Sequence, residues 1–294
     1  MVTVGAELGT AVFSFRAPGA EMFVPDGAPA ALALARTTHL GVGAHPDDLE
    51  IMAYHGIAEC FQRSDQWFSG VTLTNGGGTV QGLETLGRTD VETIDVRKLE
   101  QKKAARAGEY SAAVLLNHPS ASVKDARNAD VAADLDLVFS AARPEVVYTH
   151  NLADKHDSHV AVALRVLAAL RRLTPDERPR RVIGCEVWRD LDWMCDPDKV
   201  MMAVDGRPEL ADALLRAFDS QIRGGKRYDL AAQGRRLANA TFFESHLVDQ
   251  RQALIWGIDL TPLVADKDQD PVAFVEQHID RFAADVKVRI SRMS

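Results

Sequence analysis

Short apolar runs alternate with longer amphipathic segments along most of the chain. The apolar runs predict buried strands over residues 39–43, 68–74, 112–116, 145–149 and 182–188. Helical periodicity is expected over 28–36, before the first strand, and between the strands over 50–63, 96–107, 129–142 and 160–172. Asp95 is expected to be the N-cap of the helix at 96–107. Strands and helices that alternate in this way predict an α/β fold, a mostly parallel sheet with helices on both faces.

The two ends of the chain depart from this alternation. Residues 1–27 alternate weakly and are interrupted by proline and glycine, which predicts an N-terminal hairpin. Beyond residue 202 the pattern is largely helical, with helices over 208–222, 229–242 and 274–289. We expect one domain over 1–294, with a core at about 38–243, an N-terminal extension over 1–37 and a C-terminal helical extension over 244–294.

Composition narrows the classes of protein that remain. A hydrophobic content of 46% with 26% charged residues is typical of a soluble globular protein. The net charge of -8, with no dominant basic tract, argues against a nucleic acid or a membrane surface as partner. Neither a secretory signal nor a span of about 18 apolar residues is recognisable. The three cysteines have no metal-binding spacing. A cytoplasmic enzyme is expected.

A dense group of polar side chains follows the strand predicted at 39–43. His45, Asp47, Asp48 and Glu50 lie within one strand-to-helix turn. Zinc takes imidazole and carboxylate ligands, and catalytic zinc sites use three of them. His45 and Asp48 are three residues apart and can reach one ion. Asp47 is then free to take a proton from an activated water.

A second polar group follows the strand predicted at 145–149. Ligands in such sheets bind beyond the carboxyl ends of the strands, so we expect the two groups to meet. His159 is placed to be the third metal ligand. His156 could also ligate, or it could face the substrate and stabilise a developing oxyanion. His150 is expected to be scaffold rather than ligand.

For three other features, the sequence pattern alone gives little evidence of a functional role. Gly76-Gly77-Gly78 lacks the flanking residues of a nucleotide loop and indicates a flexible loop at the mouth of a site. Arg97 on a predicted helix would be a solvated surface residue. Trp188 is more typical of a core position than of a sugar platform.

The segment Ala44-His45-Pro46-Asp47-Asp48-Leu49-Glu50 resembles the opening signature of the PIG-L (LmbE-like) zinc-dependent deacetylases, which remove acetyl from N-acetylglucosaminyl compounds. The resemblance runs from about residue 39 to 242. It includes Arg97-x-x-Glu100, Arg143-Pro144, Glu186-Val187-Trp188, Ser220-Gln221 and the run Thr149-His150-Asn151-x-x-Asp154-x-His156-x-x-His159. It implies a Rossmann-like fold, in agreement with the pattern of strands and helices.

The resemblance also implies a role for each candidate residue. The zinc ligands would be His45, Asp48 and His159, the general base and acid Asp47, the group that stabilises the tetrahedral intermediate His156, and the substrate contacts Arg97 and Trp188. Zn²⁺ is the implied cofactor, although such ligands also suit Fe²⁺, Co²⁺ and Ni²⁺. Related proteins are often multimeric, which is compatible with a homo-oligomer here.

Two positions depart from the family pattern. The family has His-Pro-Asp-His where this chain has His156-Asp157-Ser158-His159. The aspartate that Ser158 replaces normally orients the histidine on the oxyanion side. Either Asp154 or Asp157 takes over this contact, or the pKa of His156 falls. Tyr54 is bulkier than the glycine-rich segment usual at its position, and so is expected to reshape the pocket wall.

We therefore expect metal-dependent hydrolysis of an N-acetyl amide on an N-acetylglucosaminyl-type or related amino-sugar conjugate. The alternative is a non-catalytic protein that binds a sugar or metabolite and retains the metal. A nucleotide-dependent transferase that uses Gly76 to Gly78 is a weaker third reading.

Overall fold

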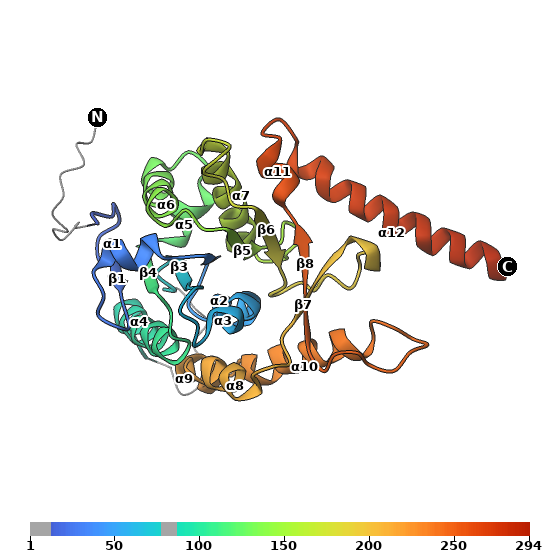
Figure 1. Cartoon of the computed structure of the whole chain (residues 1–294), viewed down its shortest axis with the longest axis horizontal. Helices are drawn as coiled ribbons and strands as arrows, with labels where there is room; N and C mark the ends of the chain where they lie inside the picture. Colours follow the sequence, from blue (N-terminus) through green and yellow to red (C-terminus); the bar gives the residue numbers. More distant parts are fainter. Residues whose placement is uncertain (1–12, 78–86) are drawn as a thin grey trace.

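The centre of the molecule is an eight-stranded sheet (Figure 1), seen in a computed structural model that describes residues 13–77 and 87–294. The strands lie in the order β1-β4-β3-β2-β5-β6-β8-β7. Their bounds are β1 Glu21–Phe23, β2 His39–Gly43, β3 Phe68–Thr74, β4 Ala112–His118, β5 Val146–His150, β6 Arg181–Cys185, β7 Lys199–Ala203 and β8 Leu254–Asp259. Neighbours from β4 to β6 are parallel, whereas β1, β8 and β7 each pair antiparallel with a neighbour. This confirms the predicted α/β fold.

Helices cover both faces of the sheet, because successive side chains of a strand point to opposite sides. In β4, Ala112 and Val114 enter one apolar core, and Ala113 between them enters the other. The first core is closed by α1 (Ala30–Ala35), α5 (Ser120–Lys124), α6 (Ala129–Ala142), α7 (Asp157–Arg172) and α11 (Thr261–Ala265). The second is closed by α2 (Asp48–Met52), α3 (Tyr54–Cys60), α4 (Asp90–Ala107) and α8 (Pro208–Arg216).

The start of α2 is held against the sheet by two glycines. A Cβ at Gly41 in β2 would lie 2.9 Å from Leu49 Cδ2, and one at Gly70 in β3 would lie 2.7 Å from Leu49 Cδ1. No side chain other than hydrogen fits there, so Leu49 sits directly on the strands. This contact sets the position of Asp48, the preceding residue.

Several element boundaries differ from those predicted. The helix expected over 50–63 is two short helices, α2 and α3, that meet at Ala53. The helix expected from residue 96 begins at Asp90, because Thr89 and Glu92 form a capping box; Asp95 is therefore not its cap. The segment 117–128, between the strand predicted at 112–116 and the helix predicted at 129–142, contains α5. The helix expected over 208–222 is divided into α8 and α9 (Asp219–Arg223), and α10 spans Tyr228–Thr241.

The extensions contribute strands to the main sheet. Residues 244–294, expected to be helical, include β8, which lies between β6 and β7. In the sequence β8 is a short apolar run, which periodicity alone does not distinguish from a segment of a buried helix. The predicted N-terminal hairpin lies partly outside the described residues. Within them, β1 pairs with β4. A 3-10 turn at Asp196–Asp198 precedes β7, and α12 (Pro271–Met293) ends the chain.

Among the described residues, no helix combines the length and the apolar character that crossing a bilayer requires.

Candidate metal centre

The two polar groups meet at the carboxyl ends of β2 and β5, which are adjacent parallel strands. The chain leaves β2 toward β3 on one side, whereas β5 lies on the other side, so this is the point at which the strand order reverses. Open α/β sheets bind their ligands at such a point. The sheet topology therefore accounts for the convergence of segments more than 100 residues apart, as for His45 and His159.

Backbone hydrogen bonds fix the carboxylate of Asp48. The amides of Ala44 and His45 donate to its Oδ2 at 3.0 and 2.7 Å. Burial alone would raise the pKa of Asp48, but the imidazoles of His159 and His150, together with side-chain hydrogen bonds to His150 and His45, hold it well below its usual range. Asp48 therefore offers an ionised carboxylate oxygen in a fixed position.

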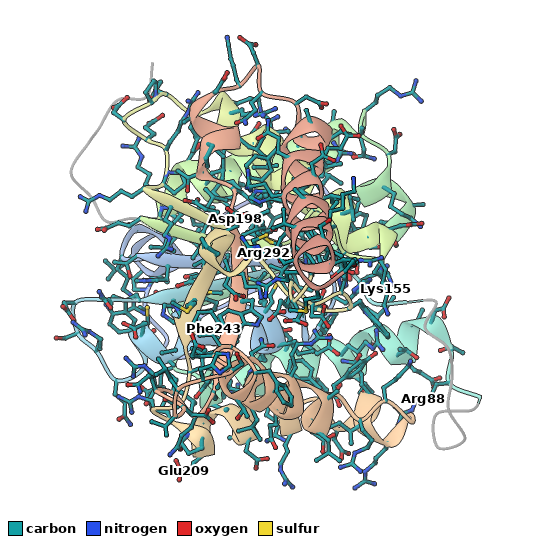
Figure 2. All side chains as sticks on the ribbon, turned by 90° about the vertical axis from the view of Figure 1, so that its right-hand side faces the viewer. Arg88, Lys155, Asp198, Glu209, Phe243 and Arg292 are labelled. Atoms are coloured by element: carbon teal, nitrogen blue, oxygen red, sulfur yellow. The ribbon has the colours of Figure 1, made fainter. Side chains whose placement is uncertain are left out.

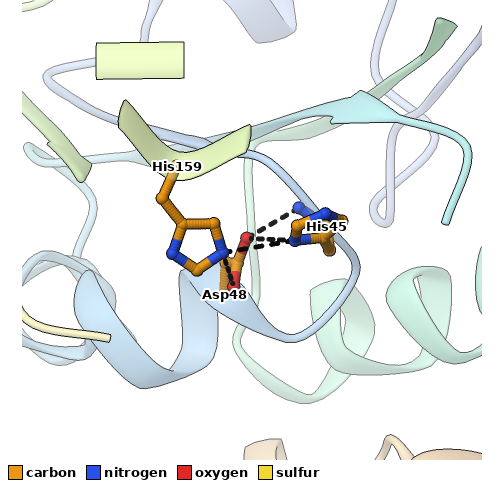
Figure 3. Close-up of side chains that lie close together, drawn as sticks. All are labelled: His45, Asp48 and His159. Atoms are coloured by element: carbon orange, nitrogen blue, oxygen red, sulfur yellow. Dashed lines mark hydrogen bonds and ion pairs between the residues drawn. The ribbon is translucent and has the colours of Figure 1, made fainter. Parts of the chain in front are cut away.

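His45, Asp48 and His159 bring three donor groups together (Figure 3). His45 Nδ1 lies 3.3 Å from Asp48 Oδ2 and 3.3 Å from His159 Nε2, which lies 3.4 Å from Asp48 Oδ1. Ligand atoms about 2.0–2.1 Å from one tetrahedral ion are roughly 3.3 Å apart. Two imidazole nitrogens that face each other beside a carboxylate are also the usual arrangement around a divalent cation. The donor set fits such an ion.

His150 contacts this donor set through the Ala44 amide and the ring of His159. Its Nε2 accepts the amide hydrogen of Ala44 at 3.0 Å, and its ring stacks on that of His159 with centroids 3.9 Å apart. Burial and the neighbouring His159 lower the pKa of His150 to about 4, so the ring is neutral. His150, Asp154 and His159 also form a cluster of potential ligands. Because Nε2 of His150 is already occupied by the Ala44 amide, the geometry favours the predicted scaffold role.

Asp154 orients His159 rather than the imidazole of His156. Its Oδ2 lies 3.4 Å from His159 Nδ1 and accepts the backbone N–H of Trp188 at 3.0 Å. Its Oδ1 accepts the backbone N–H of His156 at 2.9 Å. A carboxylate on the far nitrogen of a metal-binding histidine fixes the tautomer and the ring plane. The sequence could not tell which histidine Asp154 serves.

The two residues between the histidines do not replace the missing aspartate. Asp157 is exposed to solvent, and Ser158 is buried with its hydroxyl 2.8 Å from that of Ser120. The pKa of His156 is lowered by burial and by the nearby imidazoles of His159 and His45. Of the three predicted alternatives, the structure favours the fall in the pKa of His156, which makes the ring a neutral donor at neutral pH.

Asp47 lies beside the donor set with an unusual backbone. Its φ of 101° is in the left-handed region, a strained conformation for a residue with a side chain. Its carboxyl is buried, and burial together with the adjacent Asp48 raises its pKa well above the usual value, while Arg97 opposes this rise. A carboxyl whose pKa is raised holds a proton more readily and can both take and return one.

Arg97 is buried, and the surface position that its pattern alone predicts is wrong. Its guanidinium donates to the Gly76 carbonyl at 2.8 Å and to Gln221 Oε1 at 3.2 Å. Gln221 in turn donates to the Pro46 carbonyl at 3.0 Å. Arg97 thus helps to hold the turn that carries Asp47. Of the glycine-rich segment, Gly78 lies outside the described residues.

A cavity of about 220 Å³ is connected to the site through Trp188, although none of the three donor residues lines it. Trp188 and Tyr228 line it, and the ring of Trp188 stacks at 6.2 Å on that of His156. Tyr228 was not predicted from the sequence. It begins α10, far in sequence from both motifs, and no local sequence pattern marks it as a site residue. Burial and the carboxylates of Asp47 and Asp48 raise its pKa, which places it close to the site.

Comparisons with known proteins identify a related family and related folds. Residues 40–170 match the family model PIG-L, described as GlcNAc-PI de-N-acetylase. A curated relative, the uncharacterized deacetylase YaiS of Escherichia coli K12, is 24% identical over 134 residues, which cover 46% of this chain and 68% of the relative. The predicted resemblance is confirmed, and it supports a deacetylase-type hydrolase.

Solved structures share the fold at low sequence identity. The N,N'-diacetylchitobiose deacetylase of Pyrococcus horikoshii has a TM-score of 0.55 and 14% identity over 74% of this chain and 83% of its own. GalB, the 4-carboxy-2-hydroxymuconate hydratase of Pseudomonas putida KT2440, has a TM-score of 0.56 and 15% identity over 76% of this chain and 96% of its own. One of these proteins is a deacetylase and the other a hydratase, so the fold alone does not determine the reaction.

Proposed function

Because residues 40–170 carry a PIG-L domain, we propose that this chain is a metal-dependent deacetylase. It hydrolyses the N-acetyl amide of an N-acetylglucosaminyl-type or related amino-sugar conjugate. The observation that carries the proposal is the fit of His45, Asp48 and His159 to one divalent cation, with the carboxyl of Asp47 buried beside them.

Each residue of the site has a defined task in this reaction. His45, Asp48 and His159 would hold the cation, which supplies Lewis-acid activation of water and of the amide carbonyl. Asp47 accepts the proton of the attacking water and later returns it to the leaving amine, so that acetate and a free amine are the products. His156, neutral because its pKa is lowered, donates a hydrogen bond to the oxygen that gains negative charge.

Supporting groups keep these residues in place. Asp154 holds the ring of His159, and Arg97 with Gln221 holds the turn that contains Asp47. Trp188 and Tyr228 form apolar walls of the adjacent cavity and offer a flat surface to a sugar ring. We propose Zn²⁺ as the cation, since two imidazoles and a carboxylate are a common catalytic zinc set.

Acetate release from N-acetylglucosamine conjugates tests this proposal. Chelation should abolish release, and Zn²⁺, Fe²⁺, Co²⁺ or Ni²⁺ should restore it to different extents. Asp47→Asn keeps the shape of the side chain and should lower kcat by about 10²–10⁴-fold with metal content unchanged. If this variant keeps full activity, the assignment of the base is wrong. If the wild-type protein binds metal and sugar but releases no acetate from any conjugate, the non-catalytic binding role takes its place.

The hydratase that shares the fold calls for one further control. The same metal-loaded preparation is incubated with an unsaturated carboxylic acid, and loss of the conjugated double bond is followed by absorbance. Deacetylation predicts no change. Rapid hydration without acetate release would replace the deacetylase assignment.

A further inference from the structure

The last helix carries an apolar face that the other described residues leave largely uncovered. Figure 1 shows α12 projecting from the body of the molecule with the C terminus at its tip. Phe274 and His278 dock its first half, and Arg281 is tied to Asp198 at 2.7 Å. From Val286 to Ser294 every residue is exposed. Figure 2 views the molecule from the side toward which α12 points, with Arg292 labelled near its end.

The exposed apolar residues of α12 form a single stripe. Val272, Ile279, Val286 and Met293 are spaced seven apart, and Phe282 and Ile290 lie between them. At about 100° per residue, all six fall within an arc of roughly 80°. Their exposed fractions range from 37% to 89%. This spacing is that of a helix that packs along another helix.

The stripe is largely distinct from the face that docks α12 onto the body, although Val275, which falls within the same arc, is partly buried against the apolar core of the body. Phe274 and His278 point roughly 100° away from it around the helix. The final two turns have no packing of their own, and a helical segment without tertiary contacts is marginal in water. A partner that covers the stripe would bury its apolar side chains and stabilise the final two turns of the helix.

The charges on α12 identify the partner. Residues 270–280 carry Asp270, Glu276 and Asp280 and no lysine or arginine, whereas residues 286–294 carry three basic residues and no acidic one. Two copies of α12 placed antiparallel bring each acidic half against a basic half, and a parallel pair brings like charges together. We propose that the stripe of α12 binds the same stripe of a second copy of this chain in an antiparallel helix pair.

Sedimentation velocity of the full-length chain tests the pairing. The monomer of 32.2 kDa should give way to a species of twice that mass as the concentration rises toward about 100 µM. Ile279→Glu places a charge in the stripe at an exposed position and should weaken self-association at least about 10-fold. Val288→Glu is the matched control, since Val288 lies on the same helix about 160° from the stripe. Their exposed fractions are 46% and 47%.

Each outcome bears on the proposal. A chain that stays monomeric at the highest concentration overturns it, as does a dimer that both variants leave intact or that both weaken equally. Orientation is read from disulfide formation in mixtures of Val272→Cys and Met293→Cys chains. The antiparallel pair predicts cross-links between the two variants, and efficient cross-linking of Met293→Cys to itself would show a parallel pair. Acetate release is measured separately, so these results do not depend on the proposed reaction.

Discussion

The carboxylate of Asp154 offers the sharpest test of how the candidate metal centre is supported. Its side chain is fully buried beside His159 and accepts hydrogen bonds from the backbone N–H groups of His156 and Trp188. Asp154→Asn removes the negative charge and presents an NH₂ group where an oxygen accepted. The substitution leaves all three proposed ligands in the chain, so any change in metal affinity arises from their support.

The magnitude follows from the loss of this support. Both Asp48 and Asp154 raise the pKa of His159 against the effect of burial, which shows that Asp154 increases the basicity of the ring. Loss of a carboxylate that orients a metal-binding histidine typically costs 10–100-fold in metal affinity, or about 1.4–2.7 kcal/mol. We expect Asp154→Asn to bind Zn²⁺ weaker by this factor.

Competition with a chromophoric chelator measures the affinity, and a thermal melt without metal checks that the variant is folded. Asp157→Asn is the matched control, because Asp157 is exposed and only three residues away. It should change the affinity by less than about twofold. If Asp154→Asn binds as tightly as the wild type while Asp157→Asn is weakened, Asp157 orients the histidine and the geometry described above is not the functional one.

Two further predictions concern the scaffold. Gly70→Ala places a Cβ 2.7 Å from Leu49 and should lower the free energy of unfolding, measured in urea titrations, by about 1–3 kcal/mol. Gly234→Ala is the control: it has open space around it in α10 and should be neutral or stabilising. Equal effects of the two substitutions would mean that the contact between Leu49 and the sheet is not tight. Thr89→Ala removes the capping box at the start of α4 and should cost about 1 kcal/mol, and an unchanged urea midpoint would mean that the helix begins later in the chain.

Local patterns were sufficient for several elements of the central sheet and for one of its helices. Strands β2 and β3 and helix α6 have the predicted bounds, because apolar runs and helical periodicity are properties of neighbouring residues. The start of α4 was mispredicted although Thr89 and Glu92 are a capping box in the sequence itself. Strand β8 was missed because a short apolar run in a region that otherwise has helical periodicity is not distinguished from a buried helix segment by its own pattern.

The polar residues of the site were also evident from the sequence, since few folds place histidines and paired carboxylates at strand ends without a chemical reason. Their partners were not. Asp154 and His159 are only five residues apart, but which histidine Asp154 contacts depends on how the loop before α7 folds. The hydrogen bond from Gln221 to the Pro46 carbonyl, and the position of Tyr228 beside Trp188 in the cavity, depend on segments far apart in the chain. Sheet order decides which segments meet, and it is set by the packing of whole elements. The residues of this site could therefore be identified from the sequence, whereas their hydrogen-bond and packing partners could be identified only from the tertiary structure.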